Sequence, residues 1–371
     1  MALAIYRKYR PKILGDVLGQ EHVIEILKSA ARQNKFAHAY LFYGPRGSGK
    51  TTTARLLAKL VNCEKRLSDK KFATEGEPCN ECRVCLEIDS GRALDVIEID
   101  AASNRGIDEI RNLKEGIVLS PTSYASKVFI IDETHQLTKD AFNALLKTLE
   151  EPPAHAILIL ATTEYEKVPA TIISRTQKFH FRKIPLSVIV KKLKTIVGNE
   201  KMKVTDDALE LIAASAEGSF RDAESLLDQL TALKEEVDLS SVEKIIGKVG
   251  FQKTAELAEH ILGDRLNPAL EFLEVVGESG YNIVDLTKEL IHYLRRVVTL
   301  KLDPGLKKLF AEQFTDREMK LLEKHAGLAD PQKTVNILKS LIRAYSEMRY
   351  SPFAQIPLEV AIIENLKPSE K

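Results

Sequence analysis

Tryptophan is missing from this chain of 371 residues, and cysteine and methionine are scarce, with four residues of each. No apolar run reaches the roughly 18 residues that a membrane-spanning helix needs, and residues 1–10 lack the apolar segment of a secretory signal. A large excess of charge is missing too, because 54 Lys and Arg residues balance 53 Asp and Glu residues. We therefore expect a cytoplasmic protein with no membrane partner and no globally basic surface, although a local basic surface stays compatible with these numbers.

The few cysteines crowd into one short segment with the spacing C-x15-C-x2-C-x2-C, and they are Cys63, Cys79, Cys82 and Cys85. Structural disulfides are rare in the cytoplasm, so this crowding favours a metal site. Four thiolates can surround one tetrahedral Zn²⁺ and leave no open position, which predicts a structural zinc site in an insertion at about residues 62–90. Ligation of an iron–sulfur cluster and free buried thiols are the alternatives.

Apolar runs alternate with helical patterns in the first half of the chain. We expect strands at residues 40–43, 95–99, 127–131 and 156–161, with helices between them, for example at residues 22–32 and 139–149. The strands are apolar almost throughout, as in sheets that helices cover on both faces. This alternation predicts an α/β domain with a mainly parallel sheet.

The pattern changes after Pro185, where helical spacing appears at residues 186–194, 206–216 and 221–230, with Gly198 and Gly218 as breaks. Beyond about residue 241 the whole chain has helical periodicity, and only residues 368–371 resemble a frayed tail. We therefore predict three domains. They are an α/β domain over residues 1–180, a small helical lid over 181–240 and an all-helical domain over 241–371.

A phosphate-binding loop follows the first expected strand and precedes a helix, which is the context that the motif requires. Its residues are Gly44, Pro45, Arg46, Gly47, Ser48, Gly49, Lys50 and Thr51, followed by Thr52. Backbone N–H groups of such a loop surround phosphate oxygens at a helix N-terminus. We expect Lys50 to reach the β- and γ-phosphates of ATP and the Thr51 hydroxyl to bind Mg²⁺. The alternative, a glycine-rich turn without function, does not explain why every position of the motif fits.

Polar residues also follow the later strands, at the sheet edge where α/β proteins bind ligands. Asp132 is placed to hold Mg²⁺, and Glu133 to orient and deprotonate the attacking water, although an acidic loop that caps a helix is the alternative. Thr163 follows the next strand, where a hydroxyl can sense the γ-phosphate or merely start a turn, and the neighbouring Thr162 is a second candidate. Arg175 and Arg221 are candidate arginines for ATP contacts, and a solvated surface position is the alternative for both.

Five segments carry a resemblance to a known family. They are Tyr6-Arg7-Lys8-Tyr9-Arg10-Pro11, Gly19-Gln20-Glu21-His22, Asp100 to Gly106, Phe142 to Pro153 and Gly218 to Gln229. With these segments the chain resembles the gamma/tau family of bacterial DNA polymerase III clamp loader subunits, strongly over residues 1 to about 240 and more weakly beyond. The cysteine-rich insertion separates this family from eukaryotic and archaeal clamp loaders. The length resembles the shorter gamma form, without the polymerase- and helicase-binding segments of tau.

The resemblance implies an AAA+ P-loop ATPase in a pentamer with delta, delta-prime and further gamma subunits, at the replisome on the nucleoid. Such an assembly opens the beta sliding clamp and loads it onto primer–template DNA. The matching positions make Lys50, Thr51, Asp132 and Glu133 the ATP and Mg²⁺ site. They make Thr163 and Arg221 its sensors and Arg175 an arginine finger that acts in trans. Arg10 and Pro11 would lie near the adenine, Asn104 and Arg105 would face DNA phosphates, and the last domain would form the oligomeric collar.

Two positions depart from the family pattern. Residue 176 is Thr where the family usually has Cys, and Thr134 replaces a more usual apolar residue in Asp132-Glu133-Thr134-His135. We interpret His135 as a packed helix-start residue rather than a catalyst. The alternative functions are a nonenzymatic scaffold subunit and a DExH-type helicase, but the intact acid pair and the all-helical C-terminal region argue against them. No polymerase site of its own is expected, so a polymerase activity would belong to the holoenzyme.

Overall fold

The computed structural model divides the chain into two compact units, residues 1–184 with 218–224, and residues 185–217 with 225–371. The boundary runs through one helix near residue 224, and the finer division into three domains stays a prediction. The described residues are 3–104, 107–233, 236–246, 250–311, 314, 316–348, 350–351 and 353–366. Arg105 and the expected tail at residues 368–371 lie outside them.

The first unit contains, within its described residues, a sheet of five strands in the order β2-β3-β4-β1-β5, and every pairing is parallel. The strands are β1 (Ala39–Tyr43), β2 (Val96–Asp100), β3 (Lys127–Asp132), β4 (Ala156–Thr162) and β5 (Gln177–His180). The four strands expected from the sequence are confirmed to within a residue at each end. The sequence missed β5, because it is an edge strand in which only Phe179 is buried and the other side chains are polar.

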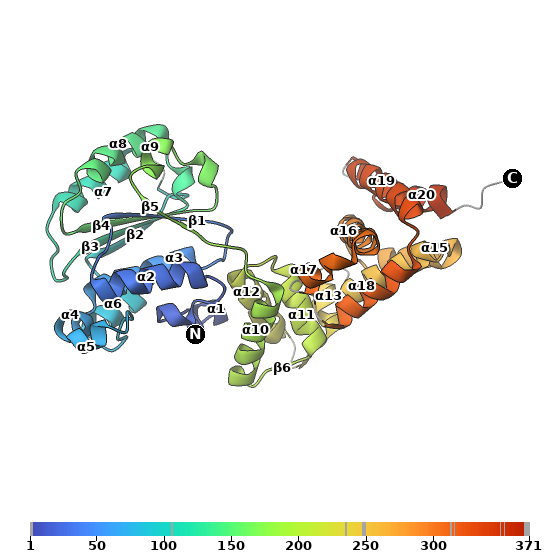
Figure 1. Cartoon of the computed structure of the whole chain (residues 1–371), viewed down its shortest axis with the longest axis horizontal. Helices are drawn as coiled ribbons and strands as arrows, with labels where there is room; N and C mark the ends of the chain where they lie inside the picture. The colour runs from blue at the N-terminus through green and yellow to red at the C-terminus, as the bar shows by residue number, and fades with distance from the viewer. Residues whose placement is uncertain are drawn as a thin grey trace. The chain divides into compact units, whose positions relative to one another are not determined.

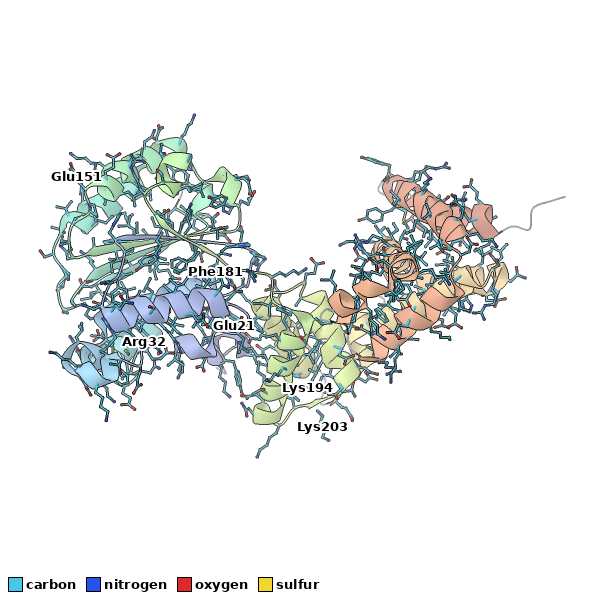
Figure 2. All side chains as sticks on the ribbon, viewed as in Figure 1. Glu21, Arg32, Glu151, Phe181, Lys194 and Lys203 are labelled. Carbon is cyan, nitrogen blue, oxygen red and sulfur yellow. The ribbon has the colours of Figure 1, made fainter. Side chains whose placement is uncertain are left out.

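Helices cover both faces of this sheet (Figure 1), as the sequence predicts. On one face lie α2 (Glu21–Gln33), α3 (Lys50–Asn62) and α6 (Arg83–Ser90), and on the other α7 (Ile107–Val118), α8 (Lys139–Glu150) and α9 (Ala170–Ile173). Alternate residues of β1 face the two cores, because Tyr40 and Phe42 pack under α2 and α3 while Leu41 packs under α8. In Figure 2, Glu21 and Arg32 mark the two ends of α2.

Short elements complete the first unit and connect the larger ones. They are α1 (Ile5–Lys8), η1 (Leu14–Asp16), α4 (Glu64–Ser68), α5 (Lys70–Ala73), η2 (Thr134–Gln136) and η3 (Tyr165–Lys167). The helices α4, α5 and α6 contain or flank the four cysteines, so the insertion expected at residues 62–90 is a small helical module. We call residues 63–90 the cysteine module below.

The second unit is helical apart from the short strands β6 (Lys203–Val204) and β7 (Glu236–Val237), among its described residues. Its helices begin with α10 (Leu186–Glu200), α11 (Asp206–Ser215), α12 (Phe220–Leu233) and α13 (Leu239–Ile246). They continue with α14 (Phe251–Leu262), α15 (Leu266–Glu278), α16 (Ile283–Leu302), η4 (Pro304–Leu306), α17 (Lys307–Ala311), α18 (Asp316–Leu328), α19 (Pro331–Met348) and α20 (Gln355–Leu366).

The helical core of this unit centres on α16, whose residues Leu286, Leu290 and Leu294 are buried. The Thr205 side chain caps α11 by accepting a hydrogen bond from Ala208 N. The prediction of a break at Gly198 is wrong, because this glycine lies inside α10, where a single glycine is tolerated by a helix that packs well. In the described part of the chain, we find no helix with the length and apolar character that crossing a membrane requires.

Candidate functional site

The phosphate-binding loop joins the end of β1 to the start of α3 at Lys50. All three of its glycines have backbone conformations that favour glycine, with φ of 144° at Gly44, 69° at Gly47 and 100° at Gly49. A Cβ atom on Gly44 would lie 2.1 Å from the Phe181 carbonyl oxygen, and one on Gly47 would lie 1.8 Å from the Ser219 Oγ. The glycines therefore let the loop bend sharply and pack closely against residues 181 and 219.

Lys50 is buried in this loop, with 6% of its surface exposed. Its Nζ donates hydrogen bonds to the carbonyl oxygens of Gly44 at 2.8 Å and Pro45 at 2.9 Å. Burial lowers the pKa of Lys50, while the charges of Glu133 and Asp132 oppose this shift. Lys50 therefore lies close enough to Asp132 and Glu133 to be affected by their charges.

Asp132 ends strand β3 and meets the start of α3. The Thr51 Oγ1 donates a 2.6 Å hydrogen bond to the Asp132 Oδ2, although 81 residues separate the two positions. The other carboxylate oxygen of Asp132 accepts a hydrogen bond from Glu133 N at 2.9 Å. A carboxylate and a hydroxyl are the oxygen ligands that suit Mg²⁺, so Thr51 and Asp132 fit the expected magnesium site.

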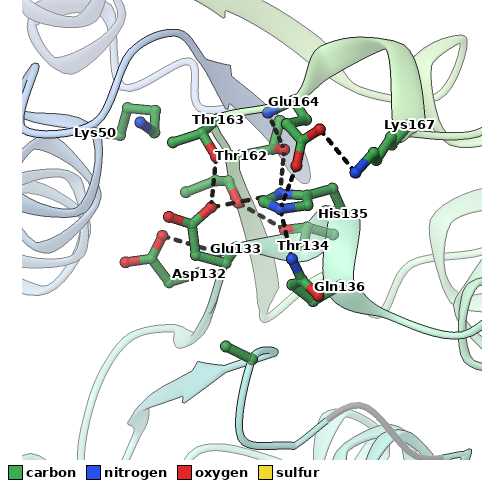
Figure 3. A network of polar contacts seen from close by, with 12 residues as sticks. Lys50, Asp132, Glu133, Thr134, His135, Gln136, Thr162, Thr163, Glu164 and Lys167 are labelled. Carbon is green, nitrogen blue, oxygen red and sulfur yellow. Dashed lines mark hydrogen bonds and ion pairs between the residues drawn. The ribbon is translucent and has the colours of Figure 1, made fainter. Parts of the chain in front are cut away.

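Glu133 follows in an unusual backbone conformation, with φ of 47° and ψ of 43°. A non-glycine residue in the left-handed region is strained, and such strain is concentrated at functional sites. The Thr163 Oγ1 donates a 3.0 Å hydrogen bond to the Glu133 Oε2 (Figure 3). The strained turn and this hydroxyl together fix the direction of the Glu133 carboxylate.

His135 lies in η2 beside this carboxylate, with its Nδ1 3.4 Å from the Glu133 Oε2. Its side chain is 5% exposed, and its Nε2 lies 3.1 Å from the Glu164 Oε1 (Figure 3). Glu164 in turn pairs with Lys167 at 2.8 Å. His135 is packed, as we expected, and its ring lies between the carboxylates of Glu133 and Glu164, with the Gln136 Nε2 also 2.9 Å from its Nε2.

The structure separates the two neighbouring threonines at the end of β4. The Thr162 side chain is buried, and its Oγ1 accepts a hydrogen bond from Glu164 N and lies 3.0 Å from the His135 Nδ1. Thr163 instead contacts Glu133. Because successive residues of a strand point to opposite sides, Thr163 is the residue of this pair whose hydroxyl reaches the candidate site.

Arg175 follows α9, and the structure does not bring it to the residues of the phosphate loop in this chain. Its guanidinium donates to the Glu150 Oε1 at 2.7 Å and to the Thr171 carbonyl oxygen at 2.8 Å. An ion pair at a half-exposed position contributes little to stability and is readily exchanged for another anion. The predicted role of Arg175 in a neighbouring subunit's site stays a prediction.

The remaining candidate arginines, Arg10 and Arg221, lie near the N-terminal segment of the first unit. Arg221, in the first turn of α12, lies 5.4 Å from the centre of the Tyr6 ring. Burial lowers the pKa of Arg10, and the nearby positive charges of Arg55 and Arg221 lower it further. Glu98 partly neutralises this cluster, because it accepts hydrogen bonds from the Arg55 guanidinium at 2.6 and 2.8 Å, and the remaining positive charge suits an anionic ligand.

The four cysteines are free thiols whose Sγ atoms all lie within 4.8 Å of one another. A tetrahedron of Zn–S bonds of about 2.3 Å has edges of about 3.8 Å, so the cluster fits a single ion with small adjustments. A hydrogen bond from Cys85 and one from the Cys79 backbone lower the pKa of Cys63 to about 4. The hydrogen bond with Cys63 raises the pKa of Cys85 and burial raises that of Cys79, so the four thiols hold their protons unequally.

Sequence comparisons place the chain in a family. Residues 19–185 match the family model described as DNA polymerase III, delta subunit, and residues 188–235 match that of the DNA polymerase III clamp loader subunit, ATPase lid domain. DNA polymerase III subunit gamma of Buchnera aphidicola is 33% identical over 96% of this chain and 96% of its own length. The chain belongs to the DNA polymerase III gamma/tau family. DNA polymerase III subunit tau of Bacillus subtilis is 42% identical, over 99% of this chain and 64% of its own length.

The match to the gamma/tau family covers both units, but it spans less than two thirds of the Bacillus subtilis tau subunit. Among solved structures, the Bacillus subtilis DNA clamp loader delta protein is 12% identical, with a TM-score of 0.42 over 93% of this chain and 99% of that protein. We rest no argument on that likeness. Membership of the gamma/tau family agrees with the presence of a phosphate loop and of polar residues at the ends of β3 and β4.

Proposed function

We propose that this chain is an ATP-hydrolysing AAA+ subunit of a bacterial DNA polymerase III clamp loader, which places the sliding clamp on primer–template DNA. The observation that carries the proposal is the meeting of Lys50, Thr51, Asp132 and Glu133 at one edge of a parallel sheet. Membership of the gamma/tau family supports the cellular task. The proposed partners are delta, delta-prime and further gamma copies in a pentamer, together with the clamp and DNA.

The residues of the site divide the work of phosphoryl transfer. The backbone of residues 44–51 and the Lys50 amino group bind the phosphates of ATP, and Lys50 exchanges its two carbonyl partners for phosphate oxygens. Thr51 and Asp132 hold magnesium, which neutralises charge on the phosphates when it is bound. Glu133 accepts a proton from the attacking water, and Thr163 keeps its carboxylate in place.

The arginines complete the proposed site from two directions. Arg221 contacts the ATP of its own chain from the start of the lid helix, and Arg10 and Pro11 border the adenine. Arg175 leaves Glu150 and contacts the ATP of a neighbouring subunit, as an arginine finger does. Hydrolysis in one subunit then depends on an arginine of the neighbouring subunit, which gives a reason for a ring-shaped assembly.

The cysteine module holds a structural zinc ion in this proposal. Four thiolates leave no open coordination position, and the short distances between the Sγ atoms suit one ion better than the larger core of an iron–sulfur cluster. The module then serves the fold rather than the reaction. Polymerase activity is ascribed to the holoenzyme and not to this chain.

A nonenzymatic scaffold subunit is the second candidate function, and one experiment separates the two. Loading of the clamp onto primed circular DNA is measured with the partner subunits, ATP and Mg²⁺, together with release of phosphate. We expect the wild-type chain to support both and the Lys50→Ala variant to support neither. Equal loading by the two proteins would overturn the ATPase proposal in favour of the scaffold.

A further inference from the structure

A glutamate of the cysteine module reaches out of the module to the N-terminal segment of the chain. The Glu77 Oε2 accepts a hydrogen bond from Leu14 N at 2.7 Å, and its Oε1 accepts one from Gly15 N at 2.9 Å. The Lys28 Nζ lies 2.6 Å from the Oε1, and only 12% of the Glu77 side chain is exposed. Charge-assisted hydrogen bonds of this kind, shielded from water, are among the stronger polar contacts in proteins.

Glu77 contacts the start of residues 14–20, and the end of this segment contacts the phosphate loop. Leu14 and Val17 are buried, so residues 14–17 are packed as well as hydrogen bonded. Gln20 is fully buried and donates hydrogen bonds to the carbonyl oxygens of Ser48 at 3.3 Å and Arg182 at 2.8 Å. Ser48 belongs to the phosphate loop, so a short buried path connects the module to that loop.

A second contact fixes the far end of the same segment. Arg66 of the module is buried and donates to the Ala31 carbonyl oxygen and to the Asn34 Oδ1, at the C-terminal end of α2. Helix α2 begins at Glu21, directly after Gln20. The module therefore holds both ends of the segment made of residues 14–34, and it constrains where Gln20 meets the phosphate loop.

The chain on the other side of Leu14 carries Arg10, a member of the arginine cluster described above. Arg10 lies four residues before Leu14, and its positive neighbours include Arg55 and Arg221. Tyr6 lies further up the segment, against Arg221. A shift of Leu14 and Gly15 would therefore move Gln20, which contacts the phosphate loop, on one side, and Arg10, which the proposed function puts beside the adenine, on the other.

We propose that Glu77 is a positioning residue that couples the cysteine module to the ATP site and raises its affinity for ATP. The inference rests on the proposed ATPase function, since it concerns the affinity of that same site. The cysteine module then does more than stabilise a surface insertion, because a change in its conformation would move Glu77 and, through residues 14–20, the phosphate loop. Glu77 itself touches neither the phosphates nor the acids in this arrangement.

The test compares Glu77→Ala and Glu77→Gln with Glu81→Ala, a matched control in the same module. Glu81 is 82% exposed, and its only ion pair is a 4.0 Å contact with Lys65, among the described residues. For each full-length protein we would measure the dissociation constant for ATP with Mg²⁺, the zinc content and the melting temperature. We expect affinity to fall about fivefold to tenfold in Glu77→Ala and less in Glu77→Gln, with unchanged zinc content and with no change in Glu81→Ala.

A role confined to stability would lower the melting temperature of Glu77→Ala and leave its ATP affinity equal to that of Glu81→Ala, and this result would overturn the inference. Amide exchange gives a second measurement, because the Leu14 and Gly15 amides should lose protection in both Glu77 variants. If Glu77→Ala does not fold, the same comparison is decided by Glu77→Gln. A wild-type chain that binds no ATP would instead reject the proposed function itself.

Discussion

The phosphate-loop site and the cysteine module are built in opposite ways. The first is assembled from the ends of β1, β3 and β4, and its Thr51 and Asp132 meet across 81 residues. The four cysteines of the second lie within residues 63–85, and their Sγ atoms all lie within 4.8 Å of one another. The first depends on the topology of the sheet and keeps groups available for a ligand, whereas the second brings its four thiols together within one short stretch of sequence.

This difference predicts whether a substitution in each region should change the chemistry of the site or the stability of the fold. Buried Lys50 and strained Glu133 are retained at a cost in stability, so replacing them should change chemistry and leave the fold intact. Cysteines that surround a structural ion contribute to folding, so replacing one should lower stability and leave the catalytic groups in place. The substitutions below test this separation, beginning with the largest expected effect.

Replacing Lys50 by Ala should weaken ATP binding by about a hundredfold or more, because the phosphates lose a charged donor inside a dry loop. We expect little change in the melting temperature, because burial lowers the pKa of Lys50 and so disfavours its charged form, which offsets the two hydrogen bonds that the variant loses. ATP titration and thermal unfolding measure both, with Lys139→Ala as an exposed control. A large loss of stability in Lys50→Ala would contradict the separation of the two regions.

Replacing Glu133 by Gln should slow ATP hydrolysis by about a hundredfold to ten-thousandfold, because the amide cannot accept the proton of the attacking water. ATP affinity should stay within about twofold, since the amide oxygen can still accept the hydrogen bond from Thr163. Single-turnover hydrolysis and ATP titration separate the two quantities. A parallel loss of affinity and turnover would assign Glu133 to binding instead.

Replacing Cys82 by Ser should remove one zinc ion per chain and lower the free energy of unfolding by at least about 2 kcal/mol. Turnover at saturating ATP should be nearly unchanged, while ATP affinity should weaken through the displaced Glu77. Metal analysis, chemical denaturation and steady-state kinetics check these three statements, with the exposed Ser90→Ala as the control. Full zinc content in Cys82→Ser would exclude the tetrathiolate site.

Replacing His135 by Ala should have the smallest effect, a threefold to tenfold fall in turnover at about constant ATP affinity. The Glu133 carboxylate then loses its 3.4 Å neighbour but keeps the hydrogen bond from Thr163. His135→Asn should restore part of the rate, because its amide nitrogen can stand near the position of the Nδ1. Because the Gln136 Nε2 contacts the His135 Nε2 at 2.9 Å, the exposed Lys139→Ala serves as the control, and an equal loss of rate there would contradict the assignment to His135.

Much of the fold and the chemistry of the site follow from local sequence patterns. Apolar runs identify β1 to β4, and the phosphate-loop motif identifies Lys50 and Thr51 because its spacing encodes a backbone shape. The edge strand β5 was not predicted, because a half-exposed strand has few apolar residues to mark it. The wrong break at Gly198 shows that packing can override the low helix propensity of one glycine.

The contacts that link distant segments could not be predicted from the sequence. Glu77 meets Leu14 across 63 residues, and a glutamate two positions before a cysteine has no distinguishing pattern. The bridge from His135 to Glu164 depends on the neighbouring positions of β3 and β4 in the sheet. The choice between Thr162 and Thr163 likewise needed the direction of each side chain at the end of a strand.

The register of the sheet restricts the number of residues that its strands can have. Tyr43 stands beside Thr162 and Asp100 beside Asp132, so the strands end almost level with one another. One residue added to or removed from β3 would carry the aspartate about 3.3 Å along the strand and turn it to the opposite face. Insertions and deletions in this protein should therefore accumulate in its loops and helical modules, while the central strands keep a constant number of residues.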